Sequence, residues 1–261
     1  HGVRNYDAFC SLFTFKQLRQ YNPRMQPVMK IVGSRNEYLL NKLIYSDEGI
    51  NAINRKVIEG LPPVNERDLY VKVDRTLAKQ ANVLMGKKTI EQVMAELNDI
   101  DSGASKLWRE VGLSKVDSIS DYVVESVKDS PVLLGCWHRD VMSKYAEQLA
   151  AKGLTVAQVH GDTKNTETIR NAFNNGSLDV LIGQMRKMGV AWNIQETCNH
   201  VVVAEAHPSN ALLEQFYKRV VRRGQQRKCT VDYILAEQLE LDELLLNVAR
   251  RKKQSDLSIR A

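Results

Sequence analysis

The chain has 261 residues, enough for one large domain or two small ones. Its hydrophobic share of 43% and charged share of 26% are ordinary for a globular protein, and its formal net charge of +6 permits a polyanionic partner without requiring one. The four cysteines form no CxxC pair, which argues against a metal site or a disulfide framework. No apolar run approaches the ~20 residues of a membrane helix, and no signal peptide is present. We therefore expect no membrane association. The sequence opens at His1 without a methionine, so we expect a fragment or a processed chain.

The first part of the chain predicts helices joined by an extended segment. Residues 38–60 have a helical pattern of apolar side chains, whereas residues 61–73 begin "LPP" and then alternate like an extended chain. Residues 78–100 are again helical in pattern. We therefore predict a mainly helical segment over residues 1–60, followed by an extended connector and a helical insertion over 61–115.

Residues 116–261 predict an α/β domain. Short apolar runs alternate with helical patterns of about ten residues, which indicates βαβ units and a doubly wound parallel sheet with helices on both faces. The predicted strands are residues 131–136, 154–159, 178–184, 200–205 and 229–235.

The stretch "LEQFYKRVVRRGQQRK" (213–228) concentrates basic residues around one glycine. Ser209 is suited to the N-cap of a helix over residues 210–223, and Gly224 to its end. On such a helix Gln215, Arg219 and Arg222 would share one face.

The apolar residues Leu212, Phe216 and Val220 would occupy a neighbouring face of the same helix and anchor it to the sheet. Two anchored guanidinium groups could stabilise a transferring phosphoryl group. From spacing alone, a solvated basic face and a phosphate site are equally good interpretations.

The pattern Gln215-x3-Arg219-x2-Arg222-x-Gly224-Gln225 resembles motif VI of the Swi/Snf-type ATPases of helicase superfamily two. "PVLLGCWHRDVMSKYAEQL" resembles their motif IV region, "VLIGQMRKMGVAWNIQ" their motif V, and "HVVVAEAHPSNALLEQ" the approach to motif VI. The resemblance runs through nearly all of the chain and is strongest to the compact bacterial, phage and annealing-helicase branch. It implies the second RecA-like lobe of a two-lobed motor.

The phosphate loop GxxxxGK[ST] and an Asp-Glu-x-His box are both missing from these 261 residues. In the family these motifs belong to the first lobe. The resemblance therefore implies that ATP and Mg²⁺ are held mainly by a first RecA-like lobe of the same protein, and that this chain alone is inactive.

The resemblance also assigns roles to residues around that ATP site. Arg219 and Arg222 correspond to the catalytic arginine fingers; for one of them a structural ion pair is the alternative. The expected nucleotide-binding residues are Gln215, Gly189, Val190 and Asn193, although Gln215 could equally be a plain surface residue. Met188 and Ala191 depart from the family, which usually has glycine there.

DNA contacts are expected in loops at the carboxyl ends of the strands, where they would position phosphates without reading sequence. The candidates are His138, Arg139, Gly161, Asp162, Thr163, Lys164, Gln184, Arg186 and Lys187. Gly161 to Lys164 would open a helix whose N-terminal amides hold a phosphate. His138 has a packed structural role as its alternative, and Trp137 is expected in the core.

We therefore predict the second lobe of an ATP-dependent duplex-DNA translocase or helicase, acting on double-stranded or branched DNA without sequence specificity. The alternative is a non-catalytic RecA-like module that docks on DNA or protein. An RNA helicase lobe is disfavoured because its motif VI normally reads His-Arg-x-Gly-Arg, and a nucleotide-cofactor enzyme because no GxGxxG follows a strand. The expected compartment is the cytoplasm of a bacterial or phage-infected cell, or the nucleus in a eukaryote.

Overall fold

A computed structural model describes residues 5–20, 26–45, 61–97, 99, 101–188 and 192–260. The chain forms two compact units, one made of His1–Val57 with Arg250–Ala261 and the other of Ile58–Ala249.

In the smaller unit a hairpin lies between two helices. Helix α1 (Tyr6–Phe13) leads into strand β1 (Thr14–Arg19), which pairs antiparallel with β2 (Val28–Ser34) before α2 (Glu37–Tyr45). The sequence prediction of a mainly helical segment over 1–60 is therefore incomplete, because residues 14–34 supply a two-stranded sheet. The predicted helix over 38–60 coincides with α2 up to Tyr45, and its remainder lies outside the described residues.

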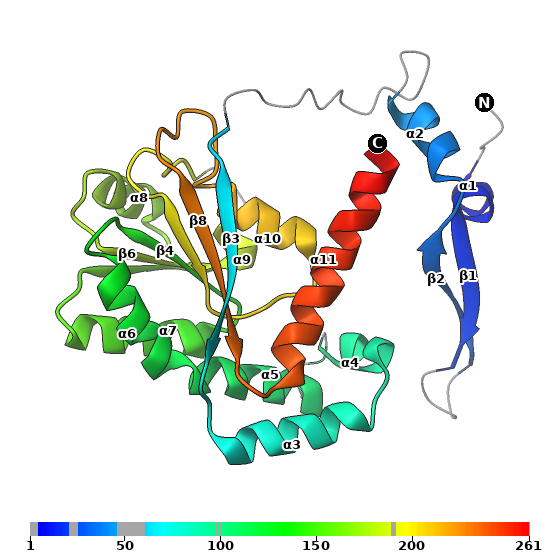
Figure 1. Cartoon of the computed structure of the whole chain (residues 1–261), viewed down its shortest axis with the longest axis horizontal. Helices are drawn as coiled ribbons and strands as arrows, with labels where there is room; N and C mark the ends of the chain where they lie inside the picture. The colour runs from blue at the N-terminus through cyan, green and yellow to red at the C-terminus, as the bar shows by residue number, and fades with distance from the viewer. Residues whose placement is uncertain are drawn as a thin grey trace. The chain divides into compact units, whose positions relative to one another are not determined.

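In the larger unit six strands form one parallel sheet in the order β3-β8-β7-β4-β6-β5 (Figure 1). This confirms the predicted α/β fold. The strands are β3 (Val64–Val71), β4 (Val132–Cys136), β5 (Val156–Val159), β6 (Val180–Gln184), β7 (His200–Val203) and β8 (Cys229–Ala236). The short central strands β4, β6 and β7 are almost wholly buried, as their unbroken apolar runs indicate.

The segment predicted as an extended connector is part of this sheet. Residues Val64–Val71 pair in parallel with the whole of β8, so the sheet begins well before residue 116. The helices α3 (Arg75–Gly86), α4 (Ile90–Glu96) and α5 (Gly103–Ser114) then connect β3 to the rest of the fold. Because β3 is an edge strand with exposed positions, its sequence lacks the apolar run of a central strand.

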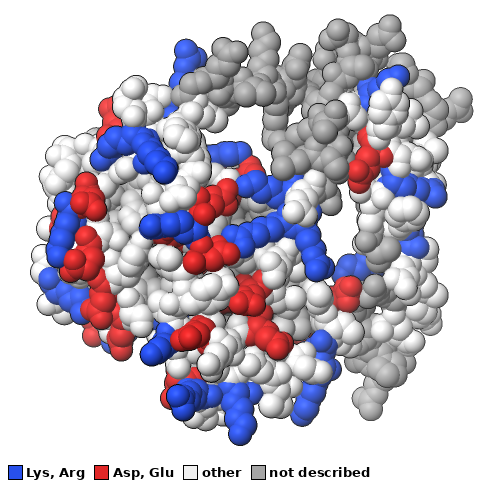
Figure 2. Space-filling view, viewed as in Figure 1, with Lys and Arg blue, Asp and Glu red and all other residues white. Residues whose placement is uncertain are grey.

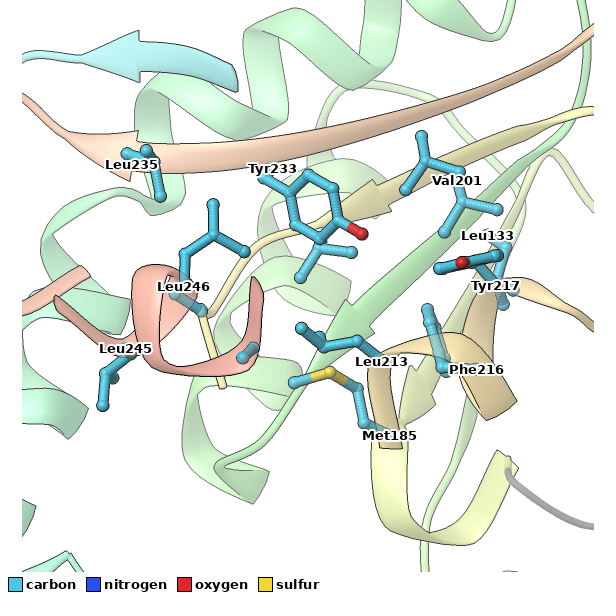
Figure 3. Close-up of a cluster of buried hydrophobic side chains, with 14 of the residues drawn as sticks. Leu133, Met185, Val201, Leu213, Phe216, Tyr217, Tyr233, Leu235, Leu245 and Leu246 are labelled. Carbon is cyan, nitrogen blue, oxygen red and sulfur yellow. The ribbon is translucent and has the colours of Figure 1, made fainter. Parts of the chain in front are cut away.

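Helices cover both faces of the sheet. Apolar side chains of α6 (Val116–Ser126) and α7 (Arg139–Ala151) form one core with Leu134 and Ile182. The opposite core joins α8 (Thr166–Asn174), α9 (Met185–Met188), α10 (Asn210–Tyr217) and α11 (Glu240–Arg260) to the other side of the strands. Figure 3 shows Leu213 and Phe216 of α10 and Leu245 and Leu246 of α11 in this second core.

A buried ion pair joins the start of α6 to the start of α11. Lys115 Nζ lies 2.6 Å from Asp242 Oδ2, and both side chains are fully buried. The same ammonium donates to the carbonyl oxygen of Ile234, and Asp242 Oδ2 also accepts the N–H of Ala236. The pair therefore fixes the start of α6 and the start of α11 against the carboxyl end of β8.

The helix predicted over residues 210–223 ends earlier than expected. Ser209 caps it as predicted, by accepting the N–H of Leu212, but α10 stops at Tyr217. The N–H groups of Arg219 and Val220 bond to carbonyls three residues back, which tightens the chain into turns. Gly224 takes the left-handed conformation expected of it, with φ +97°, at the end of these turns.

Candidate nucleotide and nucleic-acid interface

The predicted DNA contacts come from neighbouring strands. Strands β4, β5 and β6 are adjacent and parallel, so the loops that follow them emerge along one edge of the sheet. The structure thus brings together the three sequence segments that supply the predicted contacts, namely 138–139, 161–164 and 184–187. Some of their side chains are engaged in hydrogen bonds or ion pairs within the fold, and others are not.

His138 is held inside the fold. Its Nδ1 lies 2.6 Å from Oε1 of Glu205, a side chain that is completely buried just after β7. The other carboxylate oxygen, Oε2, accepts the backbone N–H groups of Trp137 and His138 at 2.7 and 3.0 Å. Glu205 therefore shapes the turn between β4 and α7. The contacts favour the structural alternative for His138.

Trp137 is half-buried rather than part of the deep core. It stacks on the buried Trp108 with ring centroids 5.7 Å apart, and it lies 4.5 Å from the His207 ring. The aromatic cluster packs beside the same turn that Glu205 holds, and it fills the space between α5 and the ends of β4 and β7.

Arg139 pairs with a second predicted contact. Its guanidinium donates to the Asp162 carboxylate and lies 3.1 Å from His160 Nδ1. The ion pair lowers the pKa of Asp162. Thr163 Oγ1 accepts the N–H of His160 at 3.0 Å and closes the loop on itself. Arg139 and Asp162 thus satisfy each other, and Asp162 would repel a phosphate.

The loop at 161–164 precedes its helix instead of opening it. Helix α8 begins at Thr166, after Asn165, so the amides of Gly161 to Lys164 are not its N-terminal amides. The prediction that these residues form the first turn of a helix is wrong. The loop geometry arises because Thr163 bonds back to His160 through both its N–H and its hydroxyl.

Three of the predicted contacts carry side chains without internal partners. Lys164, Arg186 and Lys187 are exposed, and within the part of the chain that the structure describes their charged groups make no hydrogen bond or ion pair. Gln184, at the end of β6, donates instead to the carbonyl oxygen of Trp137 at 3.2 Å. Among the predicted contacts, the cations without an internal partner, which we call the open cations, are therefore Lys164 after β5 and Arg186 and Lys187 of α9.

Arg219 and Arg222 lie on the turns after α10. Arg219 is half-buried and donates through Nε to the carbonyl oxygen of Gln215 at 2.9 Å, while Arg222 is exposed. Burial lowers the pKa of Arg219, and the positive charge of Arg222 lowers it further. The two like charges are thus close enough to destabilise each other. Among described residues no carboxylate pairs with Arg222.

Glycines of the sheet set the position of α10. A side chain on Gly135 of β4 would collide with the ring of Phe216, and one on Gly183 of β6 would collide with both Phe216 and Met188. Phe216 therefore lies directly against the backbone of two strands. The buried Met188, which departs from the family pattern, fills the space that Gly183 leaves.

Two of the four expected nucleotide-binding residues belong to the described part of the chain. Gln215 and Asn193 are exposed, and the Asn193 carbonyl accepts from Asn174 of α8 at 3.0 Å. Gly189 and Val190 lie outside the described residues. Gln225, which belongs to the same motif as Arg222, is buried.

Gln225 has a structural role of its own. Its amide donates to the carbonyls of Gln195 and Cys198 at 2.6 and 2.8 Å and accepts the N–H of Arg227. It therefore ties the turns after α10 to the segment that enters β7.

Sequence reasoning missed the buried carboxylates that hold this framework. Asp232 of β8 accepts from Arg67, Tyr122 and His200, at 2.7, 2.5 and 2.6 Å. Burial alone would raise its pKa, but these hydrogen bonds lower it to about 2. An acid inside an otherwise apolar run, as in "CTVDYIL" or at the end of "HVVVAE", is the signal that could have revealed Asp232 and Glu205.

Two further features bear on ligands and membranes. Within the described ranges, no cluster of three His, Cys, Asp or Glu side chains is arranged to hold a metal ion. No helix in the same ranges has both the length and the apolar character needed to cross a membrane.

Comparison with known proteins defines the domain. Residues 114–224 match the helicase conserved C-terminal domain. No significant match was found among curated protein sequences. In structure the chain is similar to the C-terminal part of the Fun30 ATPase domain, with 11% identity and a TM-score of 0.55 over 76% of this chain and 96% of that one.

It is also similar to T4 UvsW, with 13% identity and a TM-score of 0.53 over 74% of this chain, and it spans 40% of the UvsW chain. At such identities these likenesses establish the fold alone. The family match covers strands β4 to β7 of the parallel sheet and the turns that carry Arg219 and Arg222.

Proposed function

We propose that this chain is the second motor lobe of an ATP-dependent duplex-DNA translocase of the Swi/Snf type, in which Arg219 and Arg222 act as arginine fingers. The motor would need a first RecA-like lobe that holds MgATP through a phosphate loop, a motif with no match in these 261 residues. Closing of the two lobes would bring the guanidinium groups to the γ-phosphate.

The observation that carries the proposal is the close pair of like charges after α10. Two neighbouring guanidinium groups repel each other, and a nucleotide phosphate placed between them would offset that repulsion. Arg219 is partly buried and fixed through its bond to Gln215, while Arg222 remains open. Such an arrangement suits stabilisation of charge on the transferring phosphoryl group.

The fingers would be positioned by the anchoring of α10. Phe216 rests on Gly135 and Gly183, and Gln225 fixes the far side of the turns to Gln195. The arginines therefore stand on a rigid base, which catalysis by preorganised charge requires.

DNA would be held along the carboxyl edge by the open cations Lys164, Arg186 and Lys187. They come from neighbouring strand ends and carry no acidic partner among the described residues. Contacts of this kind are to phosphates, so binding would be strong at low salt and indifferent to sequence. Arg139 would contribute only if DNA displaced Asp162 from it.

A DNA-stimulated ATPase assay on the full-length protein tests the finger role. We expect Arg222→Ala to reduce the hydrolysis rate about 10³-fold or more while nucleotide affinity changes by only a few-fold, because the finger acts on the transition state. Arg223→Ala, which removes the adjacent exposed arginine, is the matched control and should keep most of the activity.

Two outcomes would count against the proposal. Normal turnover in Arg222→Ala with weakened ATP binding would make the residue a binding group only. Robust hydrolysis by the 261-residue chain alone would remove the need for a second lobe.

A further inference from the structure

A cavity of about 830 Å³ lies at the end of the sheet farthest from the proposed DNA contacts. It opens where β3 and β8 end, and its walls are the segment after β3, one face of α3, and the turn after β8. Its volume falls within the range of ordinary ligand sites. None of the sequence motifs that indicate a helicase lobe lies here.

Three cations line this cavity. Lys72 follows β3 directly, and Arg75 and Lys79 stand one turn apart on α3. All three are exposed, and none of them has a hydrogen bond or an ion pair within the described ranges. The only acidic side chain in the lining is Glu237, so the walls carry an excess of two positive charges.

Several surface cations of α6 and α7 differ from these three. Lys128, Lys144 and Lys152 each pair with a nearby carboxylate on the helices α6 and α7 or beside them. Helix α3, by contrast, contains no acidic residue at all. Figure 2, in the orientation of Figure 1, shows basic side chains at the bottom of the molecule, where α3 lies.

The cavity walls are held in place by the fold. Asn82 donates to the carbonyl of Gln238 at 2.9 Å and accepts the N–H of Glu240 at 3.2 Å. Gln238 has φ +62°, a left-handed conformation that is uncommon outside glycine and is often found at functional sites. The N–H of Glu237 bonds to the carbonyl of Val71, which extends the pairing of the two strands into the cavity floor.

Apolar groups complete the lining. Val73, Ala78 and Val83 lie among the three cations. Positive charges beside a small apolar wall suit a sugar–phosphate chain, in which charged phosphates alternate with apolar sugar surface. A purely solvated basic patch would need neither the wall nor the fixed turn.

The cavity also opens on the appropriate edge. All six strands are parallel, so the ends of β3 and β8 lie on the same edge as the ends of β6 and β5. Five strand spacings separate β3 from β5, or about 24 Å, which is the rise of about seven base pairs. A duplex lying across this edge could reach both ends.

We propose that the cavity formed by Lys72, Arg75 and Lys79 is a second phosphate-backbone site, which binds the same DNA as Lys164, Arg186 and Lys187. This inference rests on the proposed function for its ligand. It lengthens the DNA footprint across the whole sheet and adds a holding point that is independent of the helicase motifs.

The test compares two charge-matched triple variants of the full-length protein. K72Q/R75Q/K79Q removes the cavity cations, and K128Q/K144Q/K152Q removes three paired cations elsewhere. Duplex DNA affinity is measured by fluorescence anisotropy over a range of salt. We expect the cavity variant to bind on the order of tenfold more weakly and the slope of log K against log salt to fall by about 2 to 3, with little change in the control.

A third variant, K164Q/R186Q/K187Q, separates the two proposals. If it weakens DNA binding while the cavity variant does not, the inference is overturned and the proposed function stands. If neither weakens binding, both the cavity inference and the DNA interface fail. If the cavity variant loses affinity only for inorganic pyrophosphate or for a polyglutamate peptide, the cavity binds another anion and the inference is likewise overturned.

Crosslinking gives a direct readout. The four native cysteines are buried, so Lys79→Cys provides an accessible thiol for a photo-crosslinker, and Lys144→Cys provides the control. We expect DNA adducts from position 79 well above those from position 144. Equal yields from the two positions would contradict a backbone site in the cavity.

Discussion

Charged groups are arranged in opposite ways in two parts of this domain. Around the sheet, buried charges are matched: Glu205 with His138, Asp232 with Arg67, and Asp242 with Lys115. On the turns after α10, the positive charge of Arg222 lowers the pKa of Arg219, and no carboxylate pairs with Arg222 among the described residues. The matched groups hold the fold together, whereas the two like charges repel each other; in the proposed function a nucleotide phosphate would relieve that repulsion.

The difference gives a rule for reading the predicted DNA contacts. His138 and Arg139 have internal acidic partners, so their polar groups are already engaged within the fold. Lys164, Arg186 and Lys187 have none within the described residues. All five residues thus lie at the carboxyl edge. The residues without an acidic partner are the candidates for DNA binding, whereas those with such a partner stabilise loops.

Breaking a matched pair should give the largest effect. Lys115→Met leaves the Asp242 carboxylate buried without its counter-charge, and we expect the free energy of unfolding to fall by about 3–5 kcal/mol. The measurement is urea unfolding of the chain followed by circular dichroism. Lys128→Met, which breaks an exposed pair, should cost about 0.5 kcal/mol or less.

The double variant Lys115→Met/Asp242→Asn checks the cause. Its amide can still accept the N–H of Ala236 but carries no charge, so most of the lost stability should return. If the double variant is as unstable as the single one, packing and not the unpaired charge explains the loss.

The contact of α10 with the sheet links the buried charges to the Arg219–Arg222 turns. We expect the next largest loss of stability from a change at this contact. Gly135→Ala places a methyl group against the Phe216 ring, which should destabilise the domain by about 1–3 kcal/mol through overpacking. Gly161→Ala is the control because its nearest neighbouring atom, on Arg139, is 3.9 Å from the new carbon. Thermal unfolding of both variants gives the comparison. An unchanged unfolding temperature in Gly135→Ala would show that Phe216 of α10 does not pack against Gly135.

The matched carboxylate of β8 predicts a pH dependence. The pKa of Asp232 is about 2 in the folded chain against an ordinary 3.8, so its stabilising effect is complete above about pH 5 and is lost as the pH falls toward 2. Relative to Asp232→Asn, the native chain should lose about 1 kcal/mol by pH 3 and about 2 kcal/mol by pH 2.

Urea titrations of both proteins between pH 6 and pH 2 measure this difference. A stability gap that stays constant across the range would mean that Asp232 titrates like an ordinary carboxyl. A gap that widens on acidification would reverse the predicted sign.

The sequence predicted those parts of this domain that depend on neighbouring residues. Apolar runs such as "VLLGC" revealed the central strands because both faces of those strands are buried. The edge strand β3 was read as a connector because "VNERDLYV" is polar where it meets solvent. The early end of α10 was missed because Val220 and Val221 still turn toward the core after the helix stops.

The site was predictable only where a short motif carries it. Arg219 and Arg222 were predicted as site residues from a resemblance to one motif, and their role stays a prediction; the turns on which they lie were not predicted. The cavity could not be found this way, since Lys79 and Gln238 lie on segments about 160 residues apart that only the pairing of β3 with β8 brings together. The partners of His138 and Arg139 were hidden for the same reason.

The smallest expected effect concerns the pair of like charges, Arg219 and Arg222. If Arg219 and Arg222 repel each other in the absence of a ligand, Arg222→Ala should leave the isolated chain as stable as before or more stable by roughly 0.2–0.5 kcal/mol. Arg223→Ala serves as the control, and both are compared by chemical unfolding at low salt, where the repulsion is least screened. A loss of more than about 1 kcal/mol in Arg222→Ala would place it among the matched, structural charges. A neutral or stabilising change combined with lost hydrolysis in the full-length protein is the signature of a residue kept for its ligand, since function then maintains a charge that folding does not need.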